Sequence, residues 1–155
     1  MSKTAIIVDI DEVCSKTNEK YLMNLHADEV AKDDFSWFGK LVDNFEPSDF
    51  SLILVNLLAR HHRIIFITSR NEKTREKTVE WINRHYIFRK YYPFKLYCRD
   101  MEDLRGAVEV KLDLYKKHVE GKYNVILALD DKIGICELWK SLGITSAHIM
   151  LKEEN

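Results

Sequence analysis

Cysteine, proline and glycine are all scarce in this chain of 155 residues, which holds three, two and five of them respectively. Cys14, Cys98 and Cys136 are far apart and form no C-x-x-C pair, which argues against a disulfide framework and a structural zinc site. Little proline and glycine, together with an ordinary apolar content of 46%, argue against disorder. We therefore expect reduced thiols in a cytoplasmic protein.

Long apolar runs and a large net charge are also lacking. No run approaches the length of a bilayer span, and the first one meets aspartate at once, so we expect neither a membrane segment nor a signal peptide. The formal charge of −1 gives no general attraction to nucleic acid, and any surface for a polyanion must be local. Nothing in the sequence indicates an obligate protein partner. The length suits a single domain over residues 1–155.

Five short apolar runs rich in β-branched residues predict strands at residues 4–10, 63–68, 94–98, 124–130 and 146–150. Several are nearly continuous rather than alternating, which is typical of strands covered on both faces. Helical spacing of apolar residues lies between them, over 79–86, 108–119 and 135–142, with Gly143 as a C-cap and a further helix starting near Ser48 or Ser51. This alternation predicts an α/β fold, a three-layer sandwich around a five-stranded parallel Rossmann-like sheet.

One polar and aromatic stretch, residues 15–48, interrupts the alternation of strands and helices. It is too long for a simple strand-to-helix loop and too short for an independent domain. We interpret it as a small cap, or lid, inserted over the edge of the sheet. Its aromatic residues Phe35, Trp37 and Phe38 could shape a substrate groove or form a small satellite core.

Polar side chains follow three of the predicted strands, and ligands of open parallel sheets bind at the carboxyl ends of strands. The residues are Asp9 and Asp11, then Thr68, Ser69 and Arg70, then Asp130 and Asp131, with Lys111 near a helix start. Carboxylates that converge from two strands repel one another unless a cation lies between them. Such oxygen ligands suit Mg²⁺, and an aspartate there could accept a phosphoryl group. The alternative is an acidic turn at each strand end.

The segments "DIDEV", "ITSR", Lys111 and "LALDDK" resemble, in order and spacing, the four motifs of the haloacid dehalogenase superfamily of phosphohydrolases. The resemblance implies that Asp9 is the nucleophile and a metal ligand. Asp11 is implied to be the general acid and base, and to hold Mg²⁺ through its backbone carbonyl. Thr68 would hydrogen-bond the phosphoryl group, and Lys111 would neutralise charge. Asp130 and Asp131 would complete the metal site, one of them directly, and the sequence does not say which.

A narrower resemblance lies in the carboxyl-terminal half. "CRDMEDLRGAVEVKLDLYKKH" followed by "VILALDDKIGICELWKSLGI" is similar to the 3′-phosphatase domain of bacteriophage-type polynucleotide kinase/phosphatases. It implies that the substrate end is bound by Arg70 with the adjacent Ser69, and by Arg99 and Arg105. Without the resemblance, Arg70 would be read as the start of a surface helix, and the other two arginines as exposed loop residues. No G-x-x-x-x-G-K-[ST] motif is present, so we expect no kinase half.

Four positions depart from the pattern of that family. Glu12 and Ser69 replace usual glycines, Lys132 replaces an arginine, and Ala107 stands where an aspartate would orient Lys111 from one helical turn away. We predict a Mg²⁺-dependent phosphomonoesterase that uses an aspartyl-phosphate and acts on a nucleic-acid 3′ end or a nucleotide. Two alternatives remain open: a binding or interaction protein with weak or no turnover, which Ala107 and Glu12 favour, and a small-molecule nucleotidase.

Overall fold

The computed structural model describes residues 3–32, 36–88 and 91–152. In these residues the chain forms a five-stranded sheet of order β3-β2-β1-β4-β5, with every neighbouring pair parallel. The predicted α/β class and the parallel sheet are confirmed. The strands are β1 (Thr4–Val8), β2 (Arg63–Asn71), β3 (Lys95–Arg99), β4 (Asn124–Asp130) and β5 (Ser146–His148).

Three strands end two or more residues away from the predicted position, and β3 is shifted by one residue. The strand β1 stops at Val8 because the Ile10 carbonyl accepts hydrogen bonds from three following backbone N–H groups in a tight turn. The strand β2 continues past the expected end to Asn71, which pairs with Arg99 after an irregular stretch. The strand β5 ends at His148, two residues early. The β1 turn is what leaves the first aspartate pair at the sheet edge.

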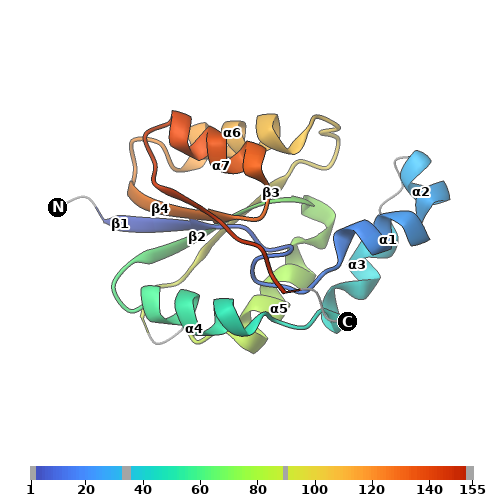
Figure 1. The fold of residues 1–155 in the computed structure, drawn as a ribbon, viewed down its shortest axis with the longest axis horizontal. Coiled ribbons are helices and arrows are strands. Elements are labelled where there is room, and N and C mark those ends of the chain that lie inside the picture. The colour runs from blue at the N-terminus through green and yellow to red at the C-terminus, as the bar shows by residue number, and fades with distance from the viewer. Residues whose placement is uncertain (1–2, 33–35, 89–90, 153–155) are drawn as a thin grey trace.

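Helices cover both faces of the sheet, as Figure 1 shows. One face carries α4 (Asp49–Leu58) and α5 (Arg75–His85), the latter preceded by the short helix η2 (Glu72–Thr74), and the other carries α6 (Ala107–His118) and α7 (Ile133–Ser141). Each face has its own apolar core, one around Trp81 and Phe66 and the other around Trp139 and Ile67. Burial on both faces explains why the strand sequences are nearly continuous apolar runs.

Two of the predicted helix boundaries are confirmed by the backbone. Ser48 is the N-cap of α4, where its hydroxyl oxygen accepts a hydrogen bond of 3.2 Å from the Ser51 N–H. Gly143 follows α7 with a φ of 78°, a left-handed conformation that glycine adopts without steric cost.

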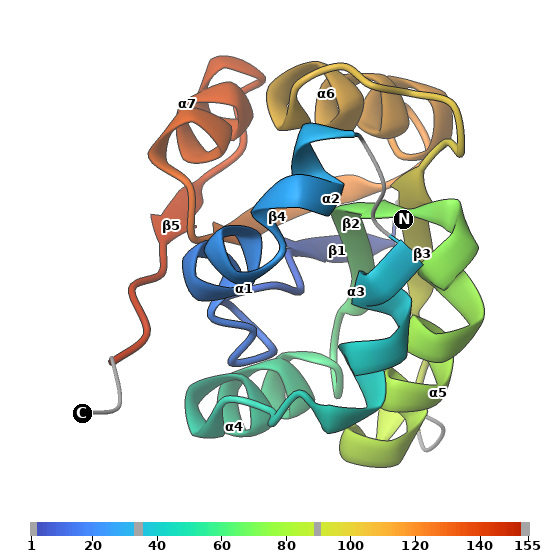
Figure 2. The same ribbon diagram turned by 90° about the vertical axis from the view of Figure 1, so that its right-hand side faces the viewer.

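The described residues between β1 and α4 form four short helices: α1 (Glu19–Leu25), α2 (Ala27–Ala31), α3 (Ser36–Leu41) and η1 (Val42–Asn44). Residues 33–35 of this stretch lie outside the described residues. Figures 1 and 2 place α1 to α3 beyond the carboxyl ends of the strands. Trp37 is buried and Phe38 packs on the core around Trp81, so this part of the stretch extends that core. None of the helices in the described ranges has both the length and the apolar character that a bilayer span requires.

Candidate active site

Three aspartates converge at the carboxyl ends of β1 and β4. Asp9 follows β1, Asp130 ends β4, and Asp131 comes next. Each offers one carboxylate oxygen, and the three oxygens lie within 4.8 Å of one another. Asp9 and Asp130 are buried, with 6% and 1% of their surface exposed, and Asp131 is half-buried. Strands β1 and β4 are neighbours in the sheet, so their ends bring together residues more than a hundred positions apart.

Lys111, on α6, lies inside this carboxylate cluster. Its ammonium nitrogen is 3.0 Å from Asp9 Oδ1 and 2.6 Å from Asp130 Oδ2, and its side chain is only 2% exposed. Ala107, one turn earlier on the same helix, packs instead against the apolar core on that face of the sheet. Lys111 is thus oriented by two aspartates from the sheet, so the carboxylate missing at position 107 is not needed for this purpose.

Burial and mutual repulsion shift the protonation of the cluster. Burial raises the pKa of Asp9 well above its ordinary value; Lys111 opposes this rise, and the other nearby aspartates add to it. Burial also raises the pKa of Asp131, with a further contribution from Asp130. For Lys111, burial alone would lower the pKa, but Asp9 and Asp130 outweigh it and raise the value, so the lysine stays charged.

The oxygens of the cluster differ in how far protein groups satisfy them. Asp130 accepts hydrogen bonds at both of its oxygens, from Lys111 at 2.6 Å and from the Lys132 backbone N–H at 3.2 Å. Asp131 Oδ1 is buried, and among the described residues it has no hydrogen-bond partner. A buried carboxylate oxygen without a partner costs free energy unless a cation or water meets it. The set of hard oxygen donors therefore fits a divalent cation such as Mg²⁺.

The carboxylate of Asp11 lies outside this group and is held by Arg70. Arg70 Nε donates to Asp11 Oδ2 at 2.9 Å and Nη2 donates to Oδ1 at 2.6 Å, while Thr17 Oγ1 donates to Oδ1 at 2.7 Å. Burial alone would raise the pKa of Asp11, but the ion pair with Arg70 and the hydrogen bonds from Arg70, Thr17 and Ser15 outweigh it and lower the value. Asp11 and Asp9 are thus shifted in opposite directions.

Thr68 and Ser69 lie in the irregular carboxyl-terminal part of β2. Thr68 is buried, and its Oγ1 accepts a hydrogen bond of 3.1 Å from the Arg70 backbone N–H. The Ser69 carbonyl accepts one of 3.0 Å from Arg99 Nε. The position of Thr68 fits a hydroxyl that caps the strand end as well as one that faces a phosphoryl group.

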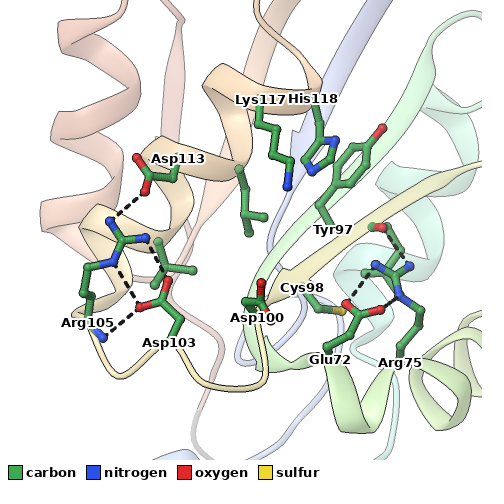
Figure 3. Close-up of a pocket in the computed structure, with 13 residues that line it drawn as sticks. Glu72, Arg75, Tyr97, Cys98, Asp100, Asp103, Arg105, Asp113, Lys117 and His118 are labelled. Carbon is green, nitrogen blue, oxygen red and sulfur yellow. Dashed lines mark hydrogen bonds and ion pairs between the residues drawn. The ribbon is translucent and has the colours of Figure 1, made fainter.

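Arg99 and Arg105 belong to a loop that begins at the end of β3. Arg99 also donates to the backbone carbonyls of Asp103 and Arg105, so its guanidinium closes this loop. Arg105 pairs with Asp103 at 2.8 Å and with Asp113 at 2.6 Å, as Figure 3 shows. Arg105, Asp103 and Asp113 line a cavity of about 490 Å³ beside β3 and α6, and neither Arg99 nor any of the four predicted metal-site aspartates lines it.

Sequence reasoning missed the hydroxyls and aromatic rings around Asp11. Ser15 and Thr17 follow the aspartate pair closely, and their hydroxyl oxygens are 2.5 Å apart. The rings of Phe38 and Phe45 face the Arg70 guanidinium. The two hydroxyls could have been found, because short polar side chains often hydrogen-bond to groups a few residues away. The two rings could not, since nothing in the sequence links them to Arg70.

Comparison with known proteins places this arrangement in a family. The family model of the polynucleotide kinase PNKP phosphatase domain matches residues 3–151. A protein of Autographa californica nuclear polyhedrosis virus, described as a bifunctional polynucleotide kinase/RNA ligase, is 32% identical over 92 residues, which are 58% of this chain and 13% of the viral protein.

Solved structures share the fold. The structure titled "Structure of the Pnkp1/Rnl/Hen1 RNA repair complex" contains a chain with a TM-score of 0.76 and 19% identity, over 96% of this chain and 43% of that one. A haloacid dehalogenase-like hydrolase from Streptococcus pneumoniae has a TM-score of 0.63 and 11% identity, over 93% and 83%. This chain thus spans less than half the length of the viral protein and of the RNA-repair chain. With the family model matched over nearly its whole length, the chain belongs to the PNKP phosphatase-domain family of haloacid dehalogenase-type phosphatases.

Proposed function

We propose that this chain is a Mg²⁺-dependent phosphomonoesterase that removes a phosphate from a nucleic-acid 3′ end through an aspartyl-phosphate on Asp9. The observation that supports the proposal most is the buried cluster of Asp9, Asp130 and Asp131 around Lys111. A structural ion pair needs one carboxylate per cation, and the excess negative charge here is expected of a site for a cation and a phosphoryl group.

The donors divide into two groups with different tasks. Asp9 and Asp131, with the backbone carbonyl of Asp11, would hold the metal, which supplies positive charge beside the phosphoryl oxygens. Asp130 has both oxygens engaged by Lys111 and by the Lys132 N–H, so we assign it to positioning Lys111. This assignment follows from the unpartnered Oδ1 of Asp131.

The reaction would have two steps at phosphorus. A carboxylate oxygen of Asp9 attacks phosphorus, the bond to the ester oxygen breaks, and that oxygen takes a proton from Asp11. Because Arg70 lowers the pKa of Asp11 in the free protein, the reactive form is the minor one in which Asp11 is protonated. Water then attacks the phosphorus of the aspartyl-phosphate and gives a proton to Asp11. The bond to Asp9 breaks, and inorganic phosphate leaves. Lys111 and the Thr68 hydroxyl would offset charge on the phosphoryl oxygens throughout.

The substrate part of the proposal rests on the family and on the short cap. A short cap leaves the strand ends open to a bulky polymer end, whereas a large cap would enclose a small metabolite. The test is a panel of 3′-phosphorylated DNA and RNA, 5′-phosphorylated ends and free nucleotides, with and without Mg²⁺. We expect release of phosphate from 3′ ends and its loss in Asp9→Asn. Activity on mononucleotides alone would identify a nucleotidase, and no turnover on any monoester would indicate a binding protein.

The same panel tests whether the chain is active without a protein partner. Activity of the purified chain would agree with the expectation that no protein partner is obligatory. Two of the fold neighbours come from Pnkp1/Rnl/Hen1 complexes, so turnover that appears only after a partner is added would point to an assembly instead.

A further inference from the structure

We propose that two aromatic side chains of the cap, Phe38 and Phe45, position the carboxylate of Asp11 by holding the guanidinium of Arg70. The inference rests on the proposed function, because Asp11 is the proton donor and acceptor there. It gives the cap a positioning task inside the protein, in addition to any contact with substrate.

Arg70 is fully engaged with protein groups at the site. Its side chain is 2% exposed, and two of its nitrogens form the paired contact with Asp11. The third nitrogen, Nη1, donates to Thr78 Oγ1 of α5 at 3.1 Å, and Nη2 also lies 3.5 Å from Ser15 Oγ. Because a guanidinium is planar and rigid, fixing all three nitrogens fixes the plane on which the Asp11 carboxylate lies.

Two rings of the cap turn their faces toward this guanidinium. The central carbon of the Arg70 guanidinium lies 5.3 Å from the centre of the Phe38 ring and 5.7 Å from that of Phe45. The two rings also contact each other, with centres 5.4 Å apart. Aromatic faces attract a guanidinium and offer no hydrogen-bonding group that could compete with Asp11.

The rings are themselves held by the rest of the protein. Phe45 is 8% exposed, and its carbonyl accepts a hydrogen bond of 2.7 Å from Trp81 Nε1 of α5. The two stems of the cap are joined by backbone hydrogen bonds of 2.8 Å from Lys16 N to the Glu46 carbonyl and from Ser48 N to the Cys14 carbonyl. The chain from Phe45 to Asp11 is thus a continuous set of fixed contacts, and loosening the rings should loosen the carboxylate.

The experiment measures the first turnover of two esters that differ in their need for a proton donor. An aryl ester such as p-nitrophenyl phosphate has a stable leaving anion, whereas a 3′-phosphorylated oligonucleotide leaves as an alkoxide that must be protonated. In Phe38→Leu and Phe45→Leu we expect the single-turnover rate for the oligonucleotide to fall by at least about tenfold. The single-turnover rate for the aryl ester should change less than about threefold, and the concentration that gives half of the maximal rate should stay the same.

Three variants serve as comparisons. Phe38→Tyr keeps the ring and should restore the oligonucleotide rate. Arg70→Lys keeps the charge but loses the paired geometry, and should repeat the selective loss even if Phe45→Leu does not fold. Tyr21→Leu changes an aromatic residue on α1 that is 58% exposed, and should behave as wild type.

The outcomes separate the two proposals. Equal losses on both esters, or no loss on either, would overturn the positioning role while the wild-type enzyme remains a phosphatase. Wild-type protein without turnover on either ester would overturn the proposed function and the positioning role with it.

Discussion

At the scale of single residues, Lys111 is the cation on which the buried carboxylates depend. The substitution Lys111→Met keeps a side chain of similar length but removes the ammonium group that pairs with Asp9 and Asp130. Removing one partner of a buried ion pair typically costs about 3–5 kcal/mol, because the remaining charge stays desolvated. We expect a loss of this size in the free energy of unfolding, measured by urea denaturation without Mg²⁺.

The same substitution on the surface of α6 provides the control. Lys116 is exposed, and Lys116→Met should leave the free energy of unfolding nearly unchanged. Adding Asp130→Asn to Lys111→Met should recover part of the loss, since one of the stranded charges is then removed. A Lys111→Met protein as stable as wild type would show that the lysine does not compensate the cluster.

Glu12 has a backbone conformation that suits glycine. Its φ is 61°, in the left-handed region, where a side chain clashes with the following carbonyl. We expect Glu12→Gly to be more stable than Glu12→Ala by about 1 kcal/mol, because only glycine lacks the clashing Cβ. Both variants lose the same carboxylate, so thermal unfolding of the pair isolates the backbone effect. Equal melting temperatures of Glu12→Gly and Glu12→Ala would contradict backbone strain at this position.

The sequence predicted which carboxylates lie together at the strand ends better than it predicted how Asp11 is held. Asp9 and Asp130 converge because parallel strands end at one edge, a property that the periodicity already implies. Lys111 reaches both of them from α6. The contact between Asp11 and Arg70 joins positions 59 apart. It depends on the irregular end of β2 and on rings from the cap, and neither is encoded in a local pattern.

At the scale of elements, the cap divides into an outer and an inner half. In the described part of α1 and α2 no residue is buried, and Tyr21 and Leu25 are exposed by 58% and 61%. The inner half differs, since Trp37, Val42 and Phe45 are all buried. In α1 only the partly buried Leu22, among the described residues, is known to pack on the core around Trp81. An element with so few apolar contacts opens more easily than the fold as a whole. The outer half is therefore expected to be the less stable one.

Hydrogen exchange can test this division of the cap. We expect amides of α1 and α2 to exchange at least about tenfold faster than those of α3 and η1, because the inner half opens only with the core around Trp81. Mass spectrometry of peptides from the native protein measures both halves in one sample, with α5 as the slow reference. Equal protection of the two halves would mean that α1 and α2 are held by contacts to the core that their exposure does not indicate.

Strand and helix positions were predictable where apolar spacing is regular, and their ends were not. The five runs and the helices after β2, β3 and β4 follow directly from periodicity. The early end of β1 depends on three hydrogen bonds to the Ile10 carbonyl, and the short helices of the cap have no long apolar period. The sequence therefore predicts which segments form the sheet and the helices that cover it, but not where the strands end. The candidate site is built from residues at those strand ends.

At the scale of the whole molecule, the net charge is only −1, although several charged side chains are concentrated at one edge of the sheet. The carboxylates at the carboxyl end of the sheet lie within a fold whose two cores enclose the strands on both faces. Repulsion between the carboxylates destabilises the folded chain when no cation is bound. A bound cation relieves this repulsion, which favours its binding to the folded state. The stability of the entire domain should thus respond to Mg²⁺.

Mg²⁺ should raise the melting temperature at neutral pH by several degrees, and the rise should shrink as the pH falls. The pKa values of Asp9 and Asp131 are raised, so without metal they add stability when protonated, and this contribution is lost as the pH increases through those values. Mg²⁺ needs the ionised forms, and its effect therefore grows over the same interval, above the ordinary aspartate pKa of 3.8.

Asp131→Asn separates repulsion from metal binding. Removing this charge should raise the melting temperature of the metal-free protein at pH 7 by a few degrees and abolish the response to Mg²⁺, since the unpartnered oxygen of Asp131 is the proposed ligand. Glu137→Gln makes the same chemical change at an exposed position of α7 and should keep the wild-type response. Scanning calorimetry from pH 5 to pH 8 with Mg²⁺ or a chelator measures both effects. A rise that does not depend on pH, or one that survives in Asp131→Asn, would place the bound cation away from the three carboxylates.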